Sequence, residues 1–196
     1  MPWAQAITWM AIGVGSARSG NVSRASQAEK ALVAQRELTS KQNNTYWTNQ
    51  IEVHRREVAA WIAEQNGKSA DSVALMRTAA ELEESMDKHA VTPGAITPAR
   101  EMLAQLLVLE HRPAEALAEY EAVLRVAPNR FNPLYGAATA AEAAGNPSAA
   151  AGYFRRLTQV AVGNERQELV TARKKVALAA SGKAKLQNLG GADATR

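Results

Sequence analysis

Few side chains in this 196-residue sequence are of the kinds that perform chemistry. The three histidines, His54, His89 and His111, are far apart, and none has a second histidine or a cysteine at the spacing of metal ligands. An imidazole that binds a metal or transfers a proton needs a second group fixed beside it. We therefore expect no metal site, with His111 as a turn residue and His89 as a cation at a helix end.

The acidic residues and the missing nucleophiles also argue against catalysis. Glu81, Glu83 and Glu84 could act as acids, but without a fixed pair across a cleft they are more simply the exposed face of a helix. Cysteine is absent, and the sequence contains no Ser/His/Asp order, phosphate-binding glycine loop or dinucleotide fingerprint. The sequence predicts a protein that is not an enzyme and holds no cofactor.

The charge is concentrated at one end of the chain. The net charge is +4, yet residues 1–164 carry 16 basic and 16 acidic side chains, whereas residues 165–196 carry 7 basic and 3 acidic ones. A neutral body with a basic end is typical of a solvated terminus, so we expect no nucleic-acid partner. The alternative is that the segment from Arg166 to Lys185 binds nucleic acid or another anionic surface.

The apolar run from Trp3 to Gly15 is interpreted as a helix. No lysine or arginine precedes it, and it is too short to span a bilayer. We therefore expect no membrane span. The compartment is unknown from sequence: the default expectation is cytoplasmic, with a periplasmic location as the alternative if the chain is a fragment of an exported protein.

Pairs of small residues indicate the elements that position these side chains. In four pairs the members are 12 positions apart, the first in an apolar stretch and the second after a break at Gly20, Gly67, His111 or Gly145. The pairs are Gly13 and Ala25, Ala60 and Ser72, Ala104 and Ala116, and Ala138 and Ala150. Helices that cross closely need residues without bulk at the crossing. The spacing therefore predicts four helical hairpins.

The last two hairpins align without a gap. Residues 97–130 and 131–164 are related by a shift of 34 positions that matches Pro113 with Pro147, and both prolines are predicted to open second helices. Thr97 and Pro98 are predicted to cap and begin the third hairpin.

The first two hairpins, 6–39 and 53–86, are each followed by extra residues. The polar run from Thr39 to Asn44 predicts a loop, Tyr46 and Trp47 are expected to lengthen the next helix backwards, and the segment 89–94 predicts an ordered excursion.

This pattern resembles the tetratricopeptide repeat (TPR). The common features are a 34-residue period, small residues at the eighth and twentieth places, an aromatic residue at the twenty-fourth and a proline near the thirty-second. Residues 97–164 match well, whereas 6–39 and 53–86 match in degenerate form, with Glu29 at a place where an apolar residue is usual. The segments YWTNQIEVHRREVAAWIA and PNRFNPLYGAATAAEAAG look like the C-terminal part of a family of bacterial TPR proteins of unassigned role.

The resemblance implies an all-α fold, a right-handed α-solenoid of about four TPR-like hairpins over residues 1–181. Leu169, Ala172, Val176 and Ala180 recur at helical spacing, so residues 165–181 are expected to form a capping helix. The remaining segment, 182–196, is small and polar, and we expect it to be disordered.

The resemblance also implies a binding groove. In the TPR the first helix of each hairpin lines the concave side, and its second, fifth, ninth and twelfth residues point toward a ligand. These positions hold acids, amides and aromatic residues. They are His54, Glu57, Trp61, Glu64, Glu101, Gln105, Asn132, Tyr135, Thr139 and Glu142. Met10 and Val14 stand where a clamp for a carboxylate would need polar residues, so a partner with a basic or apolar face is expected rather than an acidic tail.

The function expected from these observations is that of a non-catalytic scaffold. It would bind a protein or peptide of unknown identity, as an extended segment or a helix, in the concave groove. The alternative from another class is that the chain is the C-terminal structural part of a larger enzyme or transport-associated protein.

Overall fold

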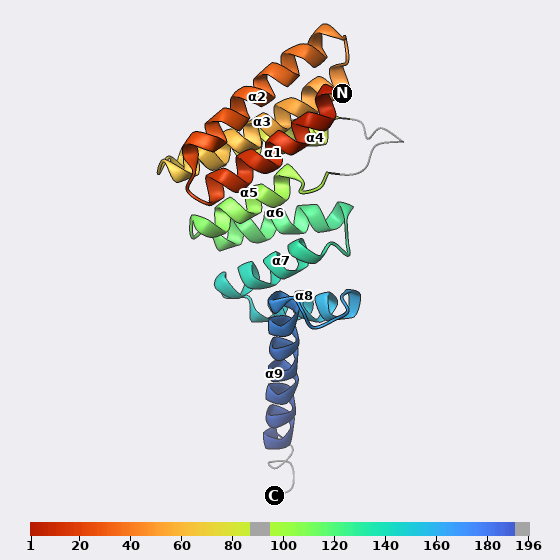
Figure 1. Ribbon diagram of the computed structural model, residues 1–196. Helices are drawn as coiled ribbons and strands as arrows, with labels where there is room; N and C mark the ends of the chain where they lie inside the picture. Colours follow the sequence, from red (N-terminus) through yellow and green to blue (C-terminus); the bar gives the residue numbers. More distant parts are fainter. Residues whose placement is uncertain (87–94, 191–196) are drawn as a thin grey trace, which may run out of the picture. The chain divides into compact units, whose positions relative to one another are not determined.

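A computed structural model describes residues 1–86 and 95–190, with the backbone alone for residues 182–190. The described residues form nine α-helices and no strand, so the all-α prediction is confirmed (Figure 1). The helices are α1 (Pro2–Arg18), α2 (Val22–Lys41), α3 (Thr45–Gln65), α4 (Ser69–Ser85), α5 (Ala99–Leu109), α6 (Pro113–Val126), α7 (Phe131–Ala143), α8 (Pro147–Val160) and α9 (Gln167–Gly190).

The chain divides into two compact units, Met1–His111 and Arg112–Arg196, called unit 1 and unit 2 below. The division lies between α5 and α6, inside the third predicted hairpin. The expected solenoid over residues 1–181 stays a prediction.

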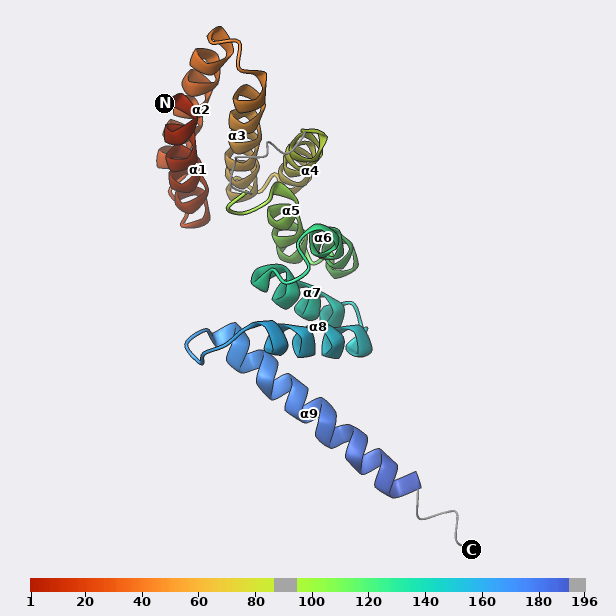
Figure 2. The ribbon, with the colours of Figure 1, turned by 90° about the vertical axis from the view of Figure 1, so that its right-hand side faces the viewer.

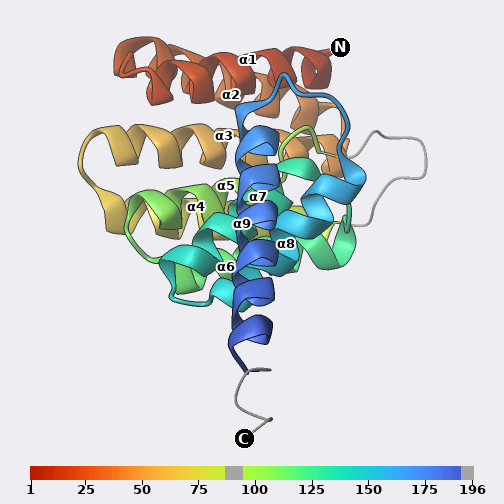
Figure 3. The same ribbon diagram turned by 90° about the horizontal axis from the view of Figure 1, so that it is seen from below.

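Unit 1 consists of helices that pack on their neighbours in sequence and also on the next helix but one. The helices α1 to α5 pack in consecutive pairs, and α3 also contacts both α1 and α5. Figure 3 shows α1, α2 and α3 running in roughly aligned directions. The apolar centre includes Ala6, Leu32, Ile51 and Val58, and partly buried tryptophans pack against it. Because α3 touches four other helices, it is the central helix of this unit.

Unit 2 consists of three short helices followed by a long one. The helix α7 packs on both α6 and α8, and α9 packs on α8. Figure 2 shows that only the first part of α9 lies beside α8, while its later part continues as a single rod. The buried side chains Leu169 and Ala172 are in that first part, whereas Leu178 is 69% exposed.

The small residues predicted at the helix crossings are all buried. Seven of the eight are 0–2% exposed, and the eighth, Gly13, is buried as well. A Cβ atom added to Gly13 would lie 2.6 Å from a methyl carbon of Val58 on α3. At Gly13, α1 therefore approaches α3 too closely for a larger residue.

The predicted breaks are turns with left-handed backbone conformation. Gly20, Gly67 and Gly145 have φ of +82°, +70° and +75°, and His111 has φ of 55°. Glycine adopts this conformation without steric cost, whereas histidine does so only at some strain. His111 is therefore a turn residue, as predicted, in a place that the other hairpins give to glycine.

The helix starts agree with the proline pattern in two places and differ in a third. Pro113 and Pro147 are at the first positions of α6 and α8, as predicted. The predicted cap at Thr97 is wrong, because α5 begins at Ala99 without any cap from its own flanking side chains. The cap comes instead from α4, where Glu83 Oε2 accepts a hydrogen bond of 2.8 Å from the Ala99 backbone N–H. A carboxylate here also favours the positive end of the α5 dipole.

Three predicted segment boundaries have different outcomes. The helix α3 begins at Thr45, so Tyr46 and Trp47 lengthen it backwards as predicted. The predicted loop 39–44 is confirmed for residues 42–44 and wrong for residues 39–41, because α2 continues through Lys41. The predicted excursion at 89–94, with His89, lies outside the described residues.

The C-terminal helix is longer than predicted. The expected capping helix 165–181 begins at Gln167, and its backbone continues to Gly190 rather than ending at residue 181. Part of the segment 182–196, expected to be disordered, is thus helical. The last six residues, 191–196, lie outside the described part of the chain.

Candidate functional site

The predicted site residues of α3 form one polar line along the helix. His54, Glu57, Trp61 and Glu64 follow one another at steps of three or four positions, which places them on one face. His54 Nδ1 lies 2.9 Å from Glu57 Oε2. All four lie within the continuous helix α3, so they share one of its faces, as predicted.

Three of the predicted groove residues are buried in the structure. Glu57 and Glu101 are 0% exposed and Trp61 is 2% exposed. The register of a helical repeat indicates which face a residue occupies but not how deeply that face is covered. Because α3 packs against α1, α2, α4 and α5, the middle of its polar line is covered by neighbouring helices.

Glu64 and Gln105 remain partly exposed at the edge of this line. Burial, together with the neighbouring carboxylate of Glu110, raises the pKa of Glu64. Ser69 Oγ donates a hydrogen bond of 2.6 Å to Glu110 Oε1, so the second carboxylate is held in place. Carboxylates lying this close together favour a cation between them.

Arg18 joins the predicted site residues of two helices, although the sequence analysis did not select it. Its guanidinium carbon lies 4.7 Å from the centre of the Trp61 ring. Its Nη1 donates a hydrogen bond of 3.0 Å to Gln105 Oε1. Three helices of unit 1, α1, α3 and α5, therefore meet at one cation and one indole. The signal that could have found Arg18 is its position four residues after Val14, a predicted groove position on α1.

A second titratable cluster lies where α3 and α4 meet the start of α5. Burial and the negative charge of Glu57 raise the pKa of Glu83 to about 7, against the opposing hydrogen bond from Ala99 N–H. Burial disfavours the charged form of His54, but the hydrogen bond that it donates to Glu57 and the negative charges of Glu57 and Glu83 outweigh this effect, so the pKa of His54 is raised. Both shifts have the direction expected where carboxylates outnumber cations. Of the three acids predicted on an exposed helix face, Glu81 and Glu84 are exposed, whereas Glu83 is partly buried.

In unit 2 the predicted residues of α7 are engaged by the segment that follows α8. Asn132 Oδ1 accepts a hydrogen bond of 3.0 Å from Arg166, and Glu142 Oε1 lies 2.8 Å from Lys175 Nζ. Tyr135 packs edge-on against the ring of Phe154, with centroids 6.2 Å apart. The hydroxyl of Thr139 donates to backbone oxygens of its own helix. These side chains are exposed or partly exposed, yet each already has a contact within unit 2.

The basic C-terminal segment is partly neutralised by the same contacts. Arg166 also lies over the ring of Phe131, and Lys175 is paired with Glu142. Arg173 donates to the backbone oxygen of Gly163 and to the side chain of Asn164. Positive charges held in this way are less available to an anionic surface than the composition alone suggests.

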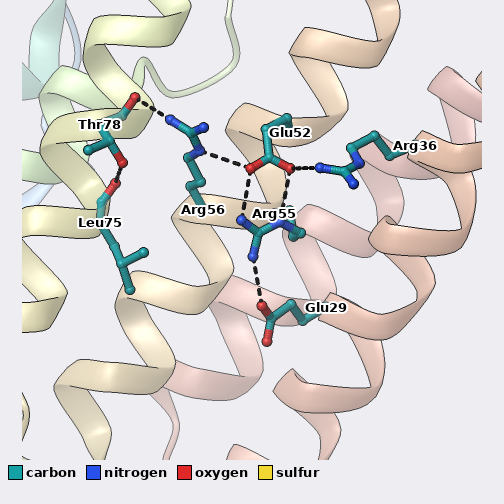
Figure 4. Close-up of polar contacts among 7 residues, drawn as sticks. All are labelled: Glu29, Arg36, Glu52, Arg55, Arg56, Leu75 and Thr78. Atoms are coloured by element: carbon teal, nitrogen blue, oxygen red, sulfur yellow. Dashed lines mark hydrogen bonds and ion pairs between the residues drawn. The ribbon is translucent and has the colours of Figure 1, made fainter. Parts of the chain in front are cut away.

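On the opposite side of α3, an ionic network joins α2, α3 and α4 (Figure 4). The Glu52 carboxylate accepts hydrogen bonds from Arg36, Arg55 and Arg56 at 2.8–2.9 Å. Burial alone would raise the pKa of Glu52, but the three guanidinium groups lower it to about 2. Arg56 also reaches the backbone oxygen of Thr78 on α4. Because both oxygens of Glu52 accept hydrogen bonds from arginines, we interpret this cluster as structural.

The same network explains the departure at Glu29. Arg55 Nη1 lies 3.1 Å from Glu29 Oε1, and the two residues are on facing helices. A charged side chain at a place usually given to an apolar one is thus compensated by an arginine 26 positions later. An ion pair between α2 and α3 thus replaces the apolar contact that is usual at this position.

No group of three or more His, Cys, Asp or Glu side chains in the described part of the chain is arranged to hold a metal ion. None of the helices described is long and apolar enough to cross a membrane.

Comparison of the chain with known protein families and with curated proteins finds no match.

Proposed function

We propose that this protein is a non-catalytic scaffold that binds a peptide or helix across the face formed by its first helices. In unit 1 the first helices are α1, α3 and α5, and the surface they form is called the first-helix face below. The observation that carries the proposal is the meeting of Arg18, Trp61 and Gln105 from three successive first helices. An aromatic anchor with a cation and an amide beside it is typical of residues that dominate protein interfaces.

The architecture supports the same function. Each described helix packs on its neighbours in sequence within its unit, and α3 contacts both α1 and α5. Such packing is what a right-handed solenoid of TPR-like hairpins requires, since its first helices lie side by side. We propose this solenoid as the finer description of the all-α fold. In repeat proteins of this kind, the face lined by adjacent helices is used for binding.

The proposal is tested by placing a photo-crosslinking amino acid at single positions of the full-length chain. The position on the first-helix face is Gln105, and Glu142 on α7 is a separate position in unit 2. Matched controls on second helices are the exposed residues Ala74 on α4 and Gly152 on α8. The labelled proteins are irradiated in extracts of the source organism, and adducts are identified by mass spectrometry.

We expect a defined adduct from Gln105 or Glu142 and none from Ala74 or Gly152. Equal adducts from all four positions would show non-specific contact and overturn the proposal. Adducts confined to Ala74 or Gly152 would place the binding surface on the second helices, which also overturns it. Circular dichroism of each labelled protein verifies that its helix content is unchanged.

A further inference from the structure

Arg18 covers a buried aromatic side chain without having an acidic partner of its own. It is an exposed residue in the last turn of α1, whereas Trp61 beneath it is 2% exposed. Its polar contact is with the neutral Gln105, and no carboxylate among the described residues forms an ion pair with it. A cation over an indole at an exposed site contributes only about 0.5–1 kcal/mol. Arg18 is therefore held over Trp61 weakly enough to be displaced.

The polar line beneath Arg18 contains buried atoms without hydrogen bonds. Trp61 Nε1 has no partner, nor does Glu57 Oε1 one turn earlier on the same face of α3. An unpaired buried polar atom costs about 1–3 kcal/mol, so these two atoms favour a ligand that brings a donor and an acceptor. A guanidinium group next to a peptide backbone provides both.

The charge around this line is negative. The carboxylates of Glu57, Glu64 and Glu83 belong to α3 and α4, and Glu110 follows α5. The cations among the same side chains are Arg18 and His54. The raised pKa values of Glu64, Glu83 and His54 show that an added positive charge is favoured here. Charge complementarity therefore indicates a cationic occupant.

We propose that Arg18 occupies, within the free protein, the place that an arginine side chain of a cationic polypeptide partner takes over Trp61 when it binds. The partner's guanidinium displaces Arg18 from the indole and from Gln105. Arginine fits better than lysine because its planar group stacks on an aromatic ring and donates in two directions at once. This inference rests on the proposed binding function of the first-helix face and specifies the partner for unit 1.

The test uses a fluorescein-labelled nona-arginine peptide as the probe and full-length protein at physiological salt. The decisive variant is Arg18→Gln, and its matched control is Arg24→Gln. Arg24 is exposed on α2, and its side chain forms no hydrogen bond or ion pair with the described residues. Both variants remove one positive charge from unit 1, so the general electrostatic gain for a cationic probe is the same.

We expect Arg18→Gln to bind the probe two- to fivefold more tightly than Arg24→Gln, the factor that corresponds to an exposed cation–π contact. A second measurement follows the indole N–H resonance of Trp61, assigned with Trp61→Phe. Nona-arginine should shift this resonance in the wild-type protein, and a glutamate peptide of equal length should not.

Equal affinities of the two variants, or an unmoved Trp61 resonance, would overturn the inference. A rise in self-association of Arg18→Gln, measured by light scattering, would also overturn it by identifying a second copy of this chain as the occupant. Failure here is distinguishable from failure of the proposed function. Adducts at Gln105 that nona-arginine does not reduce would leave the binding face standing and remove only the cationic partner.

Discussion

The two units share a register of small residues but are held together in different ways. In unit 1, the helices α1 to α4 have 17–21 residues, and charged side chains lie between them. In unit 2, α6 to α8 have 13–14 residues, and the charged contacts lie at the surface. Both units therefore need small residues where their helices approach closely. They differ in whether charged side chains lie between the helices or only at the surface.

The interior of unit 1 makes its stability dependent on charge. Glu52 gains three guanidinium partners, whereas Glu83 is buried near another carboxylate. The first arrangement stabilises the ionised form and the second destabilises it. The buried side chains of unit 2 are mainly apolar, such as Phe154, Leu157 and Leu169. The comparison can be sharpened because all four tryptophans lie in unit 1, so their fluorescence reports on that unit alone.

Gly13→Ala should give the largest loss of stability in either unit. A Cβ here would lie 2.6 and 2.7 Å from the Val58 methyl carbons and 3.2 Å from Ala28 Cβ. Val58 is buried and β-branched, so its methyl groups cannot turn away without a backbone shift. We expect the free energy of unfolding of unit 1 to fall by about 2–3 kcal/mol. The measurement is urea denaturation followed by tryptophan fluorescence.

Gly15→Ala, two residues along the same helix, is the control for Gly13→Ala. A Cβ at Gly15 meets nothing within 4 Å. Alanine is the better helix former by about 0.5–1 kcal/mol, so this variant should be slightly more stable than the wild type. Equal midpoints for the two variants would contradict the claim that α1 and α3 need a glycine at their crossing.

The second prediction concerns pH and Glu83. Its pKa is about 7 in the folded protein and 4.5 when unfolded, so the folded state binds the proton more tightly. The resulting stabilisation is fully present below pH 4.5 and is lost as the pH rises through 7. The raised pKa of His54 acts in the same direction, with stabilisation lost above pH 6.5. The free energy of unfolding of unit 1 should fall by about 2 kcal/mol between pH 5 and pH 8.

Glu83→Gln should remove most of this pH dependence, because the shift of the Glu83 pKa from 4.5 to about 7 by itself accounts for about 2 kcal/mol between pH 5 and pH 8. The amide oxygen can still accept the hydrogen bond from Ala99 N–H, so α5 keeps its cap. Glu81→Gln is the matched control, since Glu81 is exposed on the same helix. Tryptophan-detected urea titrations at several pH values provide the measurement. An unchanged slope for Glu83→Gln would assign the pH dependence to other groups.

Gly136→Ala should destabilise unit 2 less than Gly13→Ala destabilises unit 1. A Cβ at Gly136 would lie 2.3 Å from Tyr120 Cζ, a closer clash than at Gly13. The clashing atom, however, is near the end of a side chain that can tilt about its torsions, so we expect a loss of about 1 kcal/mol. Hydrogen exchange of peptides from α6 to α8 measures this unit separately. Gly152→Ala, with open space around it, should lose nothing, and a larger loss at Gly136 than at Gly13 would reverse the ranking.

The sequence was sufficient to predict the features that depend on local spacing. The buried small residues and the turns at Gly20, Gly67 and Gly145 follow from pairs of small residues 12 positions apart and from backbone preferences, and the proline helix starts follow from the 34-residue shift between residues 97–130 and 131–164. These properties need only the identity of a residue and its distance from the next break.

The features that were missed depend on contacts between helices. The burial of Glu57 and Glu101 depends on how many helices cover α3 and α5, which a repeat register does not contain. The cap of α5 comes from Glu83, 16 positions earlier, and not from the flanking Thr97. The position of Arg18 over Trp61 likewise requires the angle between α1 and α3. The surface that a partner would meet is therefore the part of the site least predictable from sequence.

The smallest predicted effect is that of Lys175→Gln at the surface of unit 2. Lys175 and Glu142 are 44% and 37% exposed, so water and salt screen their attraction, and we expect a loss below about 0.5 kcal/mol. Hydrogen exchange of the first turns of α9 provides the measurement, with the exposed neighbour Lys174→Gln as the control. The prediction assumes that α9 is attached by the burial of Leu169 and Ala172. If Lys175→Gln instead releases α9 at low salt, charge attaches this helix, and unit 2 depends on ionic contacts as unit 1 does.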